Sequence, residues 1–370
     1  MTTDQTPEAR PEDQAMEDIG ALLGETNDDW SDADDDAERT PSRLMRLLGF
    51  LAKGEGGWWT FGVLVFICVI FGVLAPDFFS QSNWVATSEY AVEYLMLALG
   101  ETFVIATGGI DLACGAVLGF SGMLSAVVMQ SMLGGHADTL LITVVGIVVA
   151  IGTGAAIGLF NGVMVTKAKL TPFIVTLGTL GMATGGTYLL DNGNQVSNLP
   201  PQIATLGTTI WLSGWLPVIF VVAAVFAVGA SVLLSRTRFG MWTYVVGSNP
   251  LAARRAGLKV DRHLIKVYML SGILAGVAGV LVTARFTIAS PIAGANDELD
   301  AIAAVVIGGA SLFGGNGTIL GTTIGVFVVS ILVTGLVLVN VQPFWQQVAV
   351  GAVLLSAVML DQLRRRLAVA

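Results

Sequence analysis

Uncharged stretches long enough to cross a membrane follow one another along most of this chain. The runs at residues 56–76, 139–166 and 170–190 hold no charged residue, and each is long enough for a helix to span a hydrocarbon core of about 30 Å. Short polar segments with Gly or Pro separate the runs. This pattern predicts an all-α protein that crosses the bilayer many times.

Charge gaps and Gly/Pro breaks divide the chain into ten predicted spans. The eighth is the weakest, because little uncharged sequence precedes Gly308 and Gly309, and we expect it to be broken or re-entrant. The predicted spans lie at about residues 57–75, 91–107, 112–133, 139–165, 171–190, 211–234, 265–288, 298–313, 318–340 and 343–361.

The charged residues between the spans predict the orientation of the chain. When the sides alternate from an inner N-terminus, 15 of the 16 basic residues after residue 42 fall inside, and only Arg285 lies near the outer face. Asp138, Asp191 and Asp297 fall outside. Cytoplasmic loops are enriched in Lys and Arg, so we expect both termini in the cytoplasm.

The composition agrees with a membrane environment. Hydrophobic residues make up 54% and charged residues 12% of the chain, with a mean hydropathy of +0.76, which excludes an ordinary soluble domain. The 45 glycines suit helices that pack closely through small residues. Gly154, Gly158 and Gly162 share one helix face, and Gly272 with Gly276 repeats the spacing, so we interpret both sets as packing surfaces.

Residues 1–42 differ from the rest of the chain. They hold 14 acidic and 2 basic residues, whereas residues 43–370 hold 13 acidic and 16 basic residues. Few apolar residues and strong self-repulsion predict a disordered acidic tail before a membrane domain at residues 43–370. Two roles stay open: a solvated tail, or a partner-binding arm anchored by Leu22, Leu23 and Trp30.

A short cationic helix is predicted between Arg236 and Lys266. Asn249 can cap it, Pro250 suits its first position, and Gly257 can end it in the left-handed conformation. Arg254 and Arg255 supply its charge. A cationic helix on the membrane surface suggests a docking surface for another protein.

Two glycine-rich breaks interrupt the apolar sequence, at residues 107–112 and 308–317. Neither ends in the Gly-Lys-Ser/Thr of a nucleotide-binding P-loop. Broken helices gather at permeation routes, because backbone released there needs protein or water around it. The alternative is a connecting turn in which Asp111 caps the next helix. The path candidates in these breaks are Gly108, Gly109, Asp111, Gly308 and Gly309.

Glu101 lies inside the second predicted span, between Leu99 and Phe103. An ionisable group at such a position usually faces a cavity or a partner. Two interpretations remain open: a path or packing residue in the bundle interior, or a water-exposed group near the inner end of the span.

The sequence carries no catalytic constellation and no metal-binding cluster. His136 and His263 are predicted on opposite sides of the membrane, so one metal site cannot use both. We therefore expect no catalytic residue, no metal, no cofactor and no nucleic-acid partner.

Four motifs in order resemble the permease subunits of ribose-type monosaccharide ABC importers, over about residues 57–366. Two departures occur: Ala113-Cys114-Gly115 replaces the usual Ser-Val-Gly, and Leu251 stands where an acidic residue is common. The motifs are Thr107–Leu112, Thr171–Gly178, Gly247–Pro250 with Ala252–Arg254 and Gly257, and Ile307–Gly309 through Phe313–Gly315.

The resemblance implies a homodimer or heterodimer of ten-helix permeases in the plasma membrane of a prokaryote, with a separate cytoplasmic ATPase and an extracytoplasmic sugar-binding protein. The transported substrate would be a monosaccharide such as ribose, xylose or galactose. The short helix would then be the coupling helix, seated in the ATPase. Its coupling residues would be Asn249, Pro250, Ala253, Arg254, Arg255 and Gly257.

Other functions stay open at this point. A permease for branched-chain amino acids or a polyol would share the architecture. A stand-alone secondary transporter or channel would leave the cytoplasmic helix without a use, and an intramembrane enzyme would need the catalytic constellation that the sequence lacks.

Overall fold

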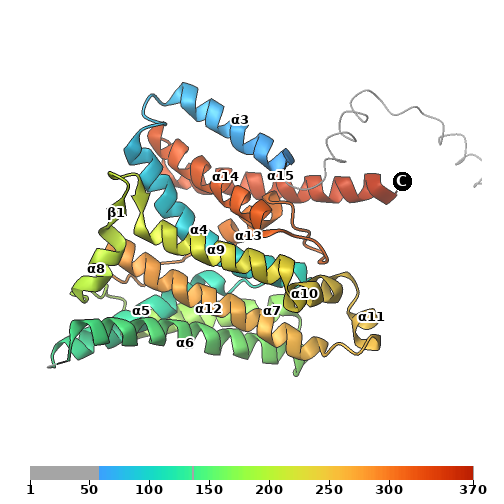
Figure 1. The fold of residues 1–370 in the computed structure, drawn as a ribbon, viewed down its shortest axis with the longest axis horizontal. Coiled ribbons are helices and arrows are strands. Elements are labelled where there is room, and N and C mark those ends of the chain that lie inside the picture. The colour runs from blue at the N-terminus through green and yellow to red at the C-terminus, as the bar shows by residue number, and fades with distance from the viewer. Residues whose placement is uncertain (1–57, 136, 370) are drawn as a thin grey trace, which may run out of the picture. The chain divides into compact units, whose positions relative to one another are not determined.

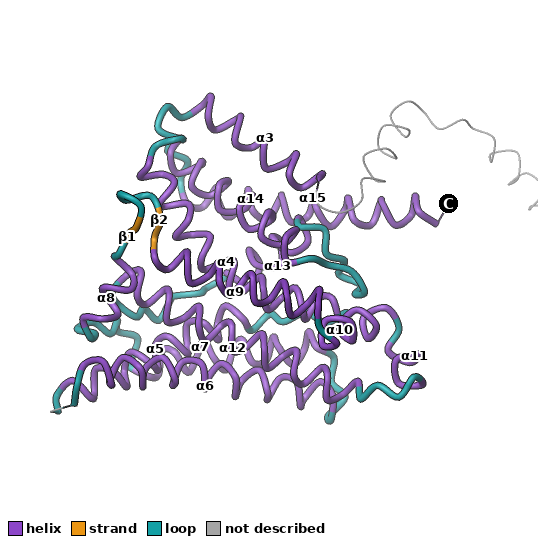
Figure 2. The backbone as a smooth tube through the Cα atoms, viewed as in Figure 1, coloured by secondary structure: helices purple, strands orange, loops and turns teal. Residues whose placement is uncertain are grey.

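The computed structural model describes residues 58–135 and 137–369. Figures 1 and 2 show that these residues form a bundle of α-helices with a single small hairpin. The acidic segment at residues 1–42 lies outside the described residues, so the division at residue 42 stays a prediction.

The elements follow one another along the chain with short connections. The two strands pair antiparallel, with Ile210 opposite Pro217 and Trp211 opposite Leu216. The elements are α3 (Trp58–Leu74), α4 (Gln81–Ala106), α5 (Cys114–Leu133), α6 (Thr139–Thr166), α7 (Pro172–Leu190), α8 (Pro201–Thr208), β1 (Ile210–Trp211), β2 (Leu216–Pro217), α9 (Val218–Arg236), α10 (Arg238–Ser248), α11 (Pro250–Arg255), α12 (Val260–Phe286), α13 (Asp297–Ile307), α14 (Ile319–Leu338) and α15 (Pro343–Val369).

Six of the described helices are long and apolar enough to cross a membrane: α5, α6, α7, α9, α12 and α14. The prediction of an all-α polytopic membrane protein is confirmed, whereas the count of ten spans stays a prediction. The eighth predicted span corresponds to α13, which has 11 residues and is therefore about 16 Å long, roughly half a hydrocarbon core. Its shortness agrees with the expected break after Ile307.

The predicted start of the sixth span at residue 211 is wrong. Residues 210–217 form the hairpin, and α9 begins at Val218. The chain turns back because Leu212, Ser213 and Gly214 all have positive φ, at 52°, 56° and 94°, which a helix does not tolerate. The segment is largely apolar, so its hydropathy alone does not reveal the turn.

The helix α10 was not predicted. Only a short helix at Asn249–Ala256 was expected between Arg236 and Lys266, but residues 238–248 form a separate helix whose cap is the Thr237 hydroxyl, which accepts from the Gly240 amide at 3.4 Å. Met241 and Trp242 are exposed on it. Its mixed surface lacks the uniform apolar character by which a membrane span is recognised.

The bundle is centred on α12, which packs against α4, α5 and α6. In an apolar 18-residue stretch of α12, 83% is buried inside the protein, whereas only 28% of the corresponding stretch of α6 is buried. The contact with α6 is made by backbone: a Cβ added at Gly154 would lie 2.0 Å from the Gly272 carbonyl oxygen. The packing role predicted for these glycines is confirmed.

Replacing Gly154 with leucine should separate α6 from α12, because the carbonyl of Gly272 leaves no room for a side chain. Overpacking typically costs about 1–3 kcal/mol, so the melting temperature of the purified protein should fall clearly. Gly152→Leu on the same helix is the matched control, since nothing lies within 4 Å of its Cβ position. Equal melting temperatures for the two variants would contradict this account.

Candidate functional site

The short helix α11 has the termini that the sequence predicts. The Asn249 side-chain oxygen accepts a hydrogen bond from the Ala252 amide at 2.9 Å, and Pro250 is the first helical residue. Gly257 has φ 83°, and the Leu258 amide bonds back to the Ala253 carbonyl at 3.1 Å. Glycine is required at Gly257 because a side chain resists this left-handed conformation.

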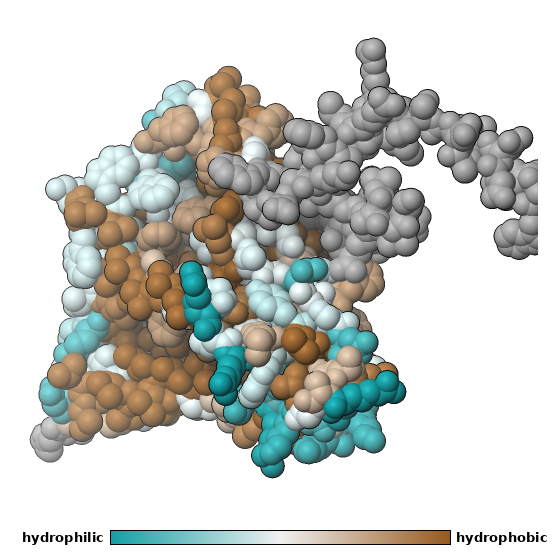
Figure 3. All heavy atoms as spheres, turned by 45° about the vertical axis from the view of Figure 1, so that its right-hand side comes forward, coloured by the Kyte–Doolittle hydropathy of each residue, from teal (hydrophilic) through white to brown (hydrophobic). Residues whose placement is uncertain are grey.

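One face of α11 is fixed to the bundle and the other is free. Ala253 is fully buried in a cluster with Val246 of α10 and Val260 of α12. Leu251 is 67% exposed, and Arg254 forms an ion pair with Asp261 at the start of α12. In Figure 3 hydrophilic residues gather at the lower right, the side on which Figure 1 shows α11. This end of the bundle therefore presents a polar, cationic helix.

The end of α10, directly before α11, meets both glycine-rich breaks. The Gly315 amide donates to the Ala106 carbonyl at 2.9 Å, which joins one break to the other. The Tyr244 hydroxyl of α10 donates to the Gly317 carbonyl at 2.6 Å. A Cβ at Gly247 would lie 1.9 Å from the Ala106 carbonyl oxygen, so the three segments touch through backbone. We call this contact of residues 106–108, 244–248 and 313–317 the three-segment junction.

The four glycines predicted as path candidates have four different surroundings. Gly108 belongs to the three-segment junction, where a Cβ would lie 3.6 Å from the Phe313 carbonyl oxygen. Gly109 lies against the Tyr268 hydroxyl of α12, and Gly308 lies against Gly321 of α14. Gly309 has φ 90° and open space at its Cβ position. Their place in a translocation path stays a prediction.

Asp111 lies in the break between α4 and α5, against the middle of α12, and accepts two hydrogen bonds. One of its oxygens accepts from the Ala113 amide at 3.0 Å, one residue before α5, and the other accepts from the Ser271 hydroxyl at 3.0 Å. Ala113, and not Asp111, is the cap residue of α5. Asp111 therefore stabilises the start of α5 and also ties the break to α12.

Glu101 is fully buried, which excludes the water-exposed interpretation. Among the described residues, neither of its carboxylate oxygens has a hydrogen-bond partner, and the same is true of the nearby Tyr268 hydroxyl. The Cys114 thiol and the Asp111 amide lie close to Glu101 but outside hydrogen-bonding geometry. An unsatisfied buried polar group costs about 1–3 kcal/mol, so this arrangement is unfavourable in the conformation seen here.

The N-termini of α5 and α13 meet in the interior of the bundle. A Cβ at Gly115 would lie 2.4 Å from the Gly294 carbonyl oxygen and 2.5 Å from a carboxylate oxygen of Glu298. Glu298 therefore lies at the start of α5, where the helix dipole favours a negative charge. Substrate sites of many transporters are built at such broken-helix ends near the middle of the membrane.

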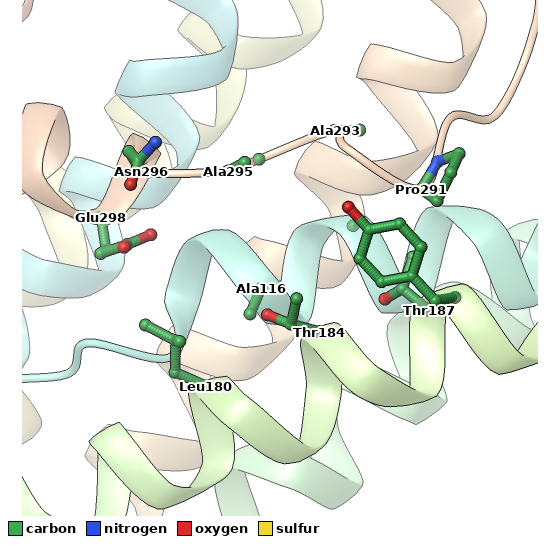
Figure 4. A pocket seen from close by; sticks show the side chains of 12 residues that line it. Ala116, Leu180, Thr184, Thr187, Pro291, Ala293, Ala295, Asn296 and Glu298 are labelled. Atoms are coloured by element: carbon green, nitrogen blue, oxygen red, sulfur yellow. The ribbon is translucent and has the colours of Figure 1, made fainter. Parts of the chain in front are cut away.

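A pocket of about 200 Å³ opens beside this contact. In Figure 4 the side chains of Thr184, Thr187 and Glu298 border it, from α7 and from the start of α13. We call it the α5–α7 pocket. None of the six path candidates predicted from the sequence lines it.

Sequence analysis missed the residues that line the α5–α7 pocket. Two signals were available: Thr184 and Thr187 recur at helical spacing in an apolar span, and Asp297, Glu298 and Asp300 form a group of acidic residues at the start of the eighth span. Both signals are weak alone, because a threonine in a membrane helix often only bonds to its own backbone, as Thr187 does to the Ala183 carbonyl.

The comparisons with known proteins agree with this architecture. The family model described as "Branched-chain amino acid transport system / permease component" matches residues 84–358. No solved structure matches the chain.

Several curated proteins match over most of their length. The ribose import permease protein of Bacillus subtilis is 39% identical, over 81% of this chain and 90% of the relative. The D-allose transport system permease protein of Escherichia coli is 36% identical, over 82% and 91%. The autoinducer 2 import system permease protein of Yersinia pestis is 30% identical, over 85% and 87%. With its membrane helices and its four motifs, the chain belongs to the permease family of ribose-type ABC importers.

Proposed function

We propose that this chain is the membrane-spanning subunit of an ATP-driven importer of a monosaccharide. The similarity to ribose and allose permeases supports this substrate class, whereas a branched-chain amino acid finds support only in the description of the family model. The subunit itself carries out no chemistry on the sugar. It forms the path and transmits the work of a separate ATPase.

We further propose the assembly and the orientation. Two permease subunits, identical or different, would pair in the plasma membrane of a prokaryote, with the α11 end and both termini in the cytoplasm. The distribution of basic residues supports this orientation. A cytoplasmic ABC ATPase would bind α11, and an extracytoplasmic binding protein would deliver the sugar at the α8 end.

The observation that carries the proposal is the three-segment junction. A displacement of α11 would be transmitted to both breaks through α10, because the end of α10 contacts both breaks through a hydrogen bond and close backbone packing. The break at residues 308–317 connects α13 to α14, and the break at residues 107–112 precedes α5. The helices α5 and α13 begin at the α5–α7 pocket, so closure of the ATPase would reshape that pocket.

Substrate uptake into proteoliposomes tests the proposed function. The permease, reconstituted with its ATPase and binding protein, should take up labelled D-ribose or D-allose only when ATP is present inside. L-leucine, offered in the same way, should not enter. Uptake of leucine alone would favour an amino-acid permease, and sugar uptake without ATP would indicate a secondary transporter.

Removing the Tyr244 hydroxyl should weaken coupling without weakening docking. Tyr244→Phe loses the bond to the Gly317 carbonyl, which is worth about 1 kcal/mol, so sugar uptake per ATP hydrolysed should fall by roughly fivefold. Co-purification of the ATPase should be unchanged, because α11 is intact.

Ser235→Ala is the matched control for Tyr244→Phe. It removes an exposed hydroxyl that, among the described residues, bonds only to its own helix, at the Ser231 carbonyl. Wild-type coupling in both variants would remove the junction from the mechanism.

Substitution of Glu101 should lower transport without lowering stability. Glu101→Leu removes two unsatisfied oxygens, so the melting temperature should stay equal or rise, while sugar uptake should fall roughly tenfold if the carboxyl group meets water or sugar in another conformation. Glu101→Gln keeps a polar group, so its sugar uptake should lie between that of the wild type and that of Glu101→Leu. Normal uptake by Glu101→Leu would show that this residue is outside the path.

A further inference from the structure

A second and larger pocket, of about 430 Å³, lies between α4, α13, α14 and α15. It borders Ala295 and Asn296, which also border the α5–α7 pocket. The two pockets therefore flank one turn, in which Gly294 and Asn296 have φ 74° and 72°. We call the larger one the α4–α15 pocket. Its polar lining consists of Asn296, Tyr90 and Tyr94 of α4, Asp297 and Asp300 of α13, and Gln346 and Gln347 of α15.

The polar lining combines two acceptor carboxylates, Asp297 and Asp300, with amide and phenol groups that can both donate and accept hydrogen bonds. One carboxylate oxygen of Asp297 is buried and has no hydrogen-bond partner among the described residues. Asp300 lies against the Tyr94 hydroxyl. The ion pairs of Arg285, the nearby cation, go to Glu89 and Glu93, at 3.3 and 3.8 Å, and not to the pocket carboxylates. A ligand that fits here must bring hydrogen-bond donors for the carboxylates and can also accept from the amide groups, as a hydroxyl group does.

The rest of the lining is apolar. Leu299, Val333, Val350 and Leu354 lie beside the polar groups. A sugar has the matching character, because its hydroxyl groups donate at the rim while its C–H surface packs on aliphatic and aromatic side chains. Ligand sites commonly combine a mainly apolar wall with a few placed polar groups, in volumes of about 300–1,000 Å³.

We propose that the α4–α15 pocket binds a neutral polyhydroxy compound and holds the transported sugar beside the start of α13, apart from the α5–α7 pocket. The proposal rests on the proposed function for the identity of the ligand. Binding at this pocket places the sugar against the turn at residues 294–296, which is the element shared with the α5–α7 pocket. Displacement of that turn would connect the two pockets.

Gly351 is a position at which a larger side chain should fill the pocket without disturbing the surrounding helices. It lines the pocket on α15, is exposed, and has nothing within 4 Å of its Cβ position. Gly351→Phe should therefore occupy the ligand space without a clash against backbone, and Gly351→Ala is the matched control. Both changes favour the helix over glycine.

The experiment measures D-ribose and D-allose binding to the full-length permease in nanodiscs, by saturation-transfer NMR, alongside uptake in proteoliposomes. Gly351→Phe should weaken sugar binding by about tenfold or more, which corresponds to at least 1.4 kcal/mol, and Gly351→Ala should bind as wild type. Asp300→Asn, which keeps the shape and removes the charge, should weaken binding by a smaller factor.

Each outcome decides the proposal. Sugar binding that Gly351→Phe leaves unchanged would overturn it, and so would the absence of sugar binding in the wild-type protein. Choline serves as the probe for a cation site: choline binding that Asp300→Asn abolishes, without sugar binding, would assign the pocket to organic cations. If ATP-dependent sugar uptake persists in any of these cases, the proposed function stands and only the pocket assignment fails.

Discussion

Backbone groups that leave a helix inside a membrane protein must find partners in the protein, because lipid supplies none. This constraint governs the two glycine-rich breaks. The carbonyl freed at the end of α4, on Ala106, accepts the amide of Gly315 in the other break. The amide of Ala113 before α5 is satisfied by Asp111. Two breaks that lie about 200 residues apart in the sequence are thereby joined, and α10 completes the contact.

Close approach of backbone makes these bonds possible and also builds the frame around them. Gly154 and Gly272 let α6 and α12 touch, and Gly115 lets α5 meet the turn at Gly294. Dispersion contacts and backbone proximity hold membrane helices together where the hydrophobic effect does not distinguish helix from lipid. The result is a central helix, α12, that packs against α4, α5 and α6. The broken segments lie beside this closely packed core.

Charge is placed where this frame lowers its cost. Asp297, Glu298 and Asp300 occupy the first turn of α13, and Glu298 also faces the start of α5, so helix dipoles offset part of the desolvation penalty. Arg285 is neutralised by Glu89 and Glu93 and covered by the Tyr90 ring at 4.4 Å. Glu101 has no such support. Glu298 lines the α5–α7 pocket, and Asp297 and Asp300 line the α4–α15 pocket, so each pocket contains at least one carboxylate acceptor.

The sequence alone determined the membrane class, most of the helices and the ends of α11, because hydropathy, Pro, Gly and cap residues act within a few residues of one another. Asn249, for example, caps α11 through a bond to the amide of Ala252, three residues away, which needs no contact with another helix. The hairpin at residues 210–217, the separate helix α10 and the burial of Glu101 depended on tertiary structure. So did the meeting of the two breaks and the lining of both pockets, since Thr184 and Glu298 share one surface, and Tyr94 and Asp300 another, only when distant helices pack. Local rules decide which residues form a helix, whereas the satisfaction of freed backbone and buried charge decides which helices meet.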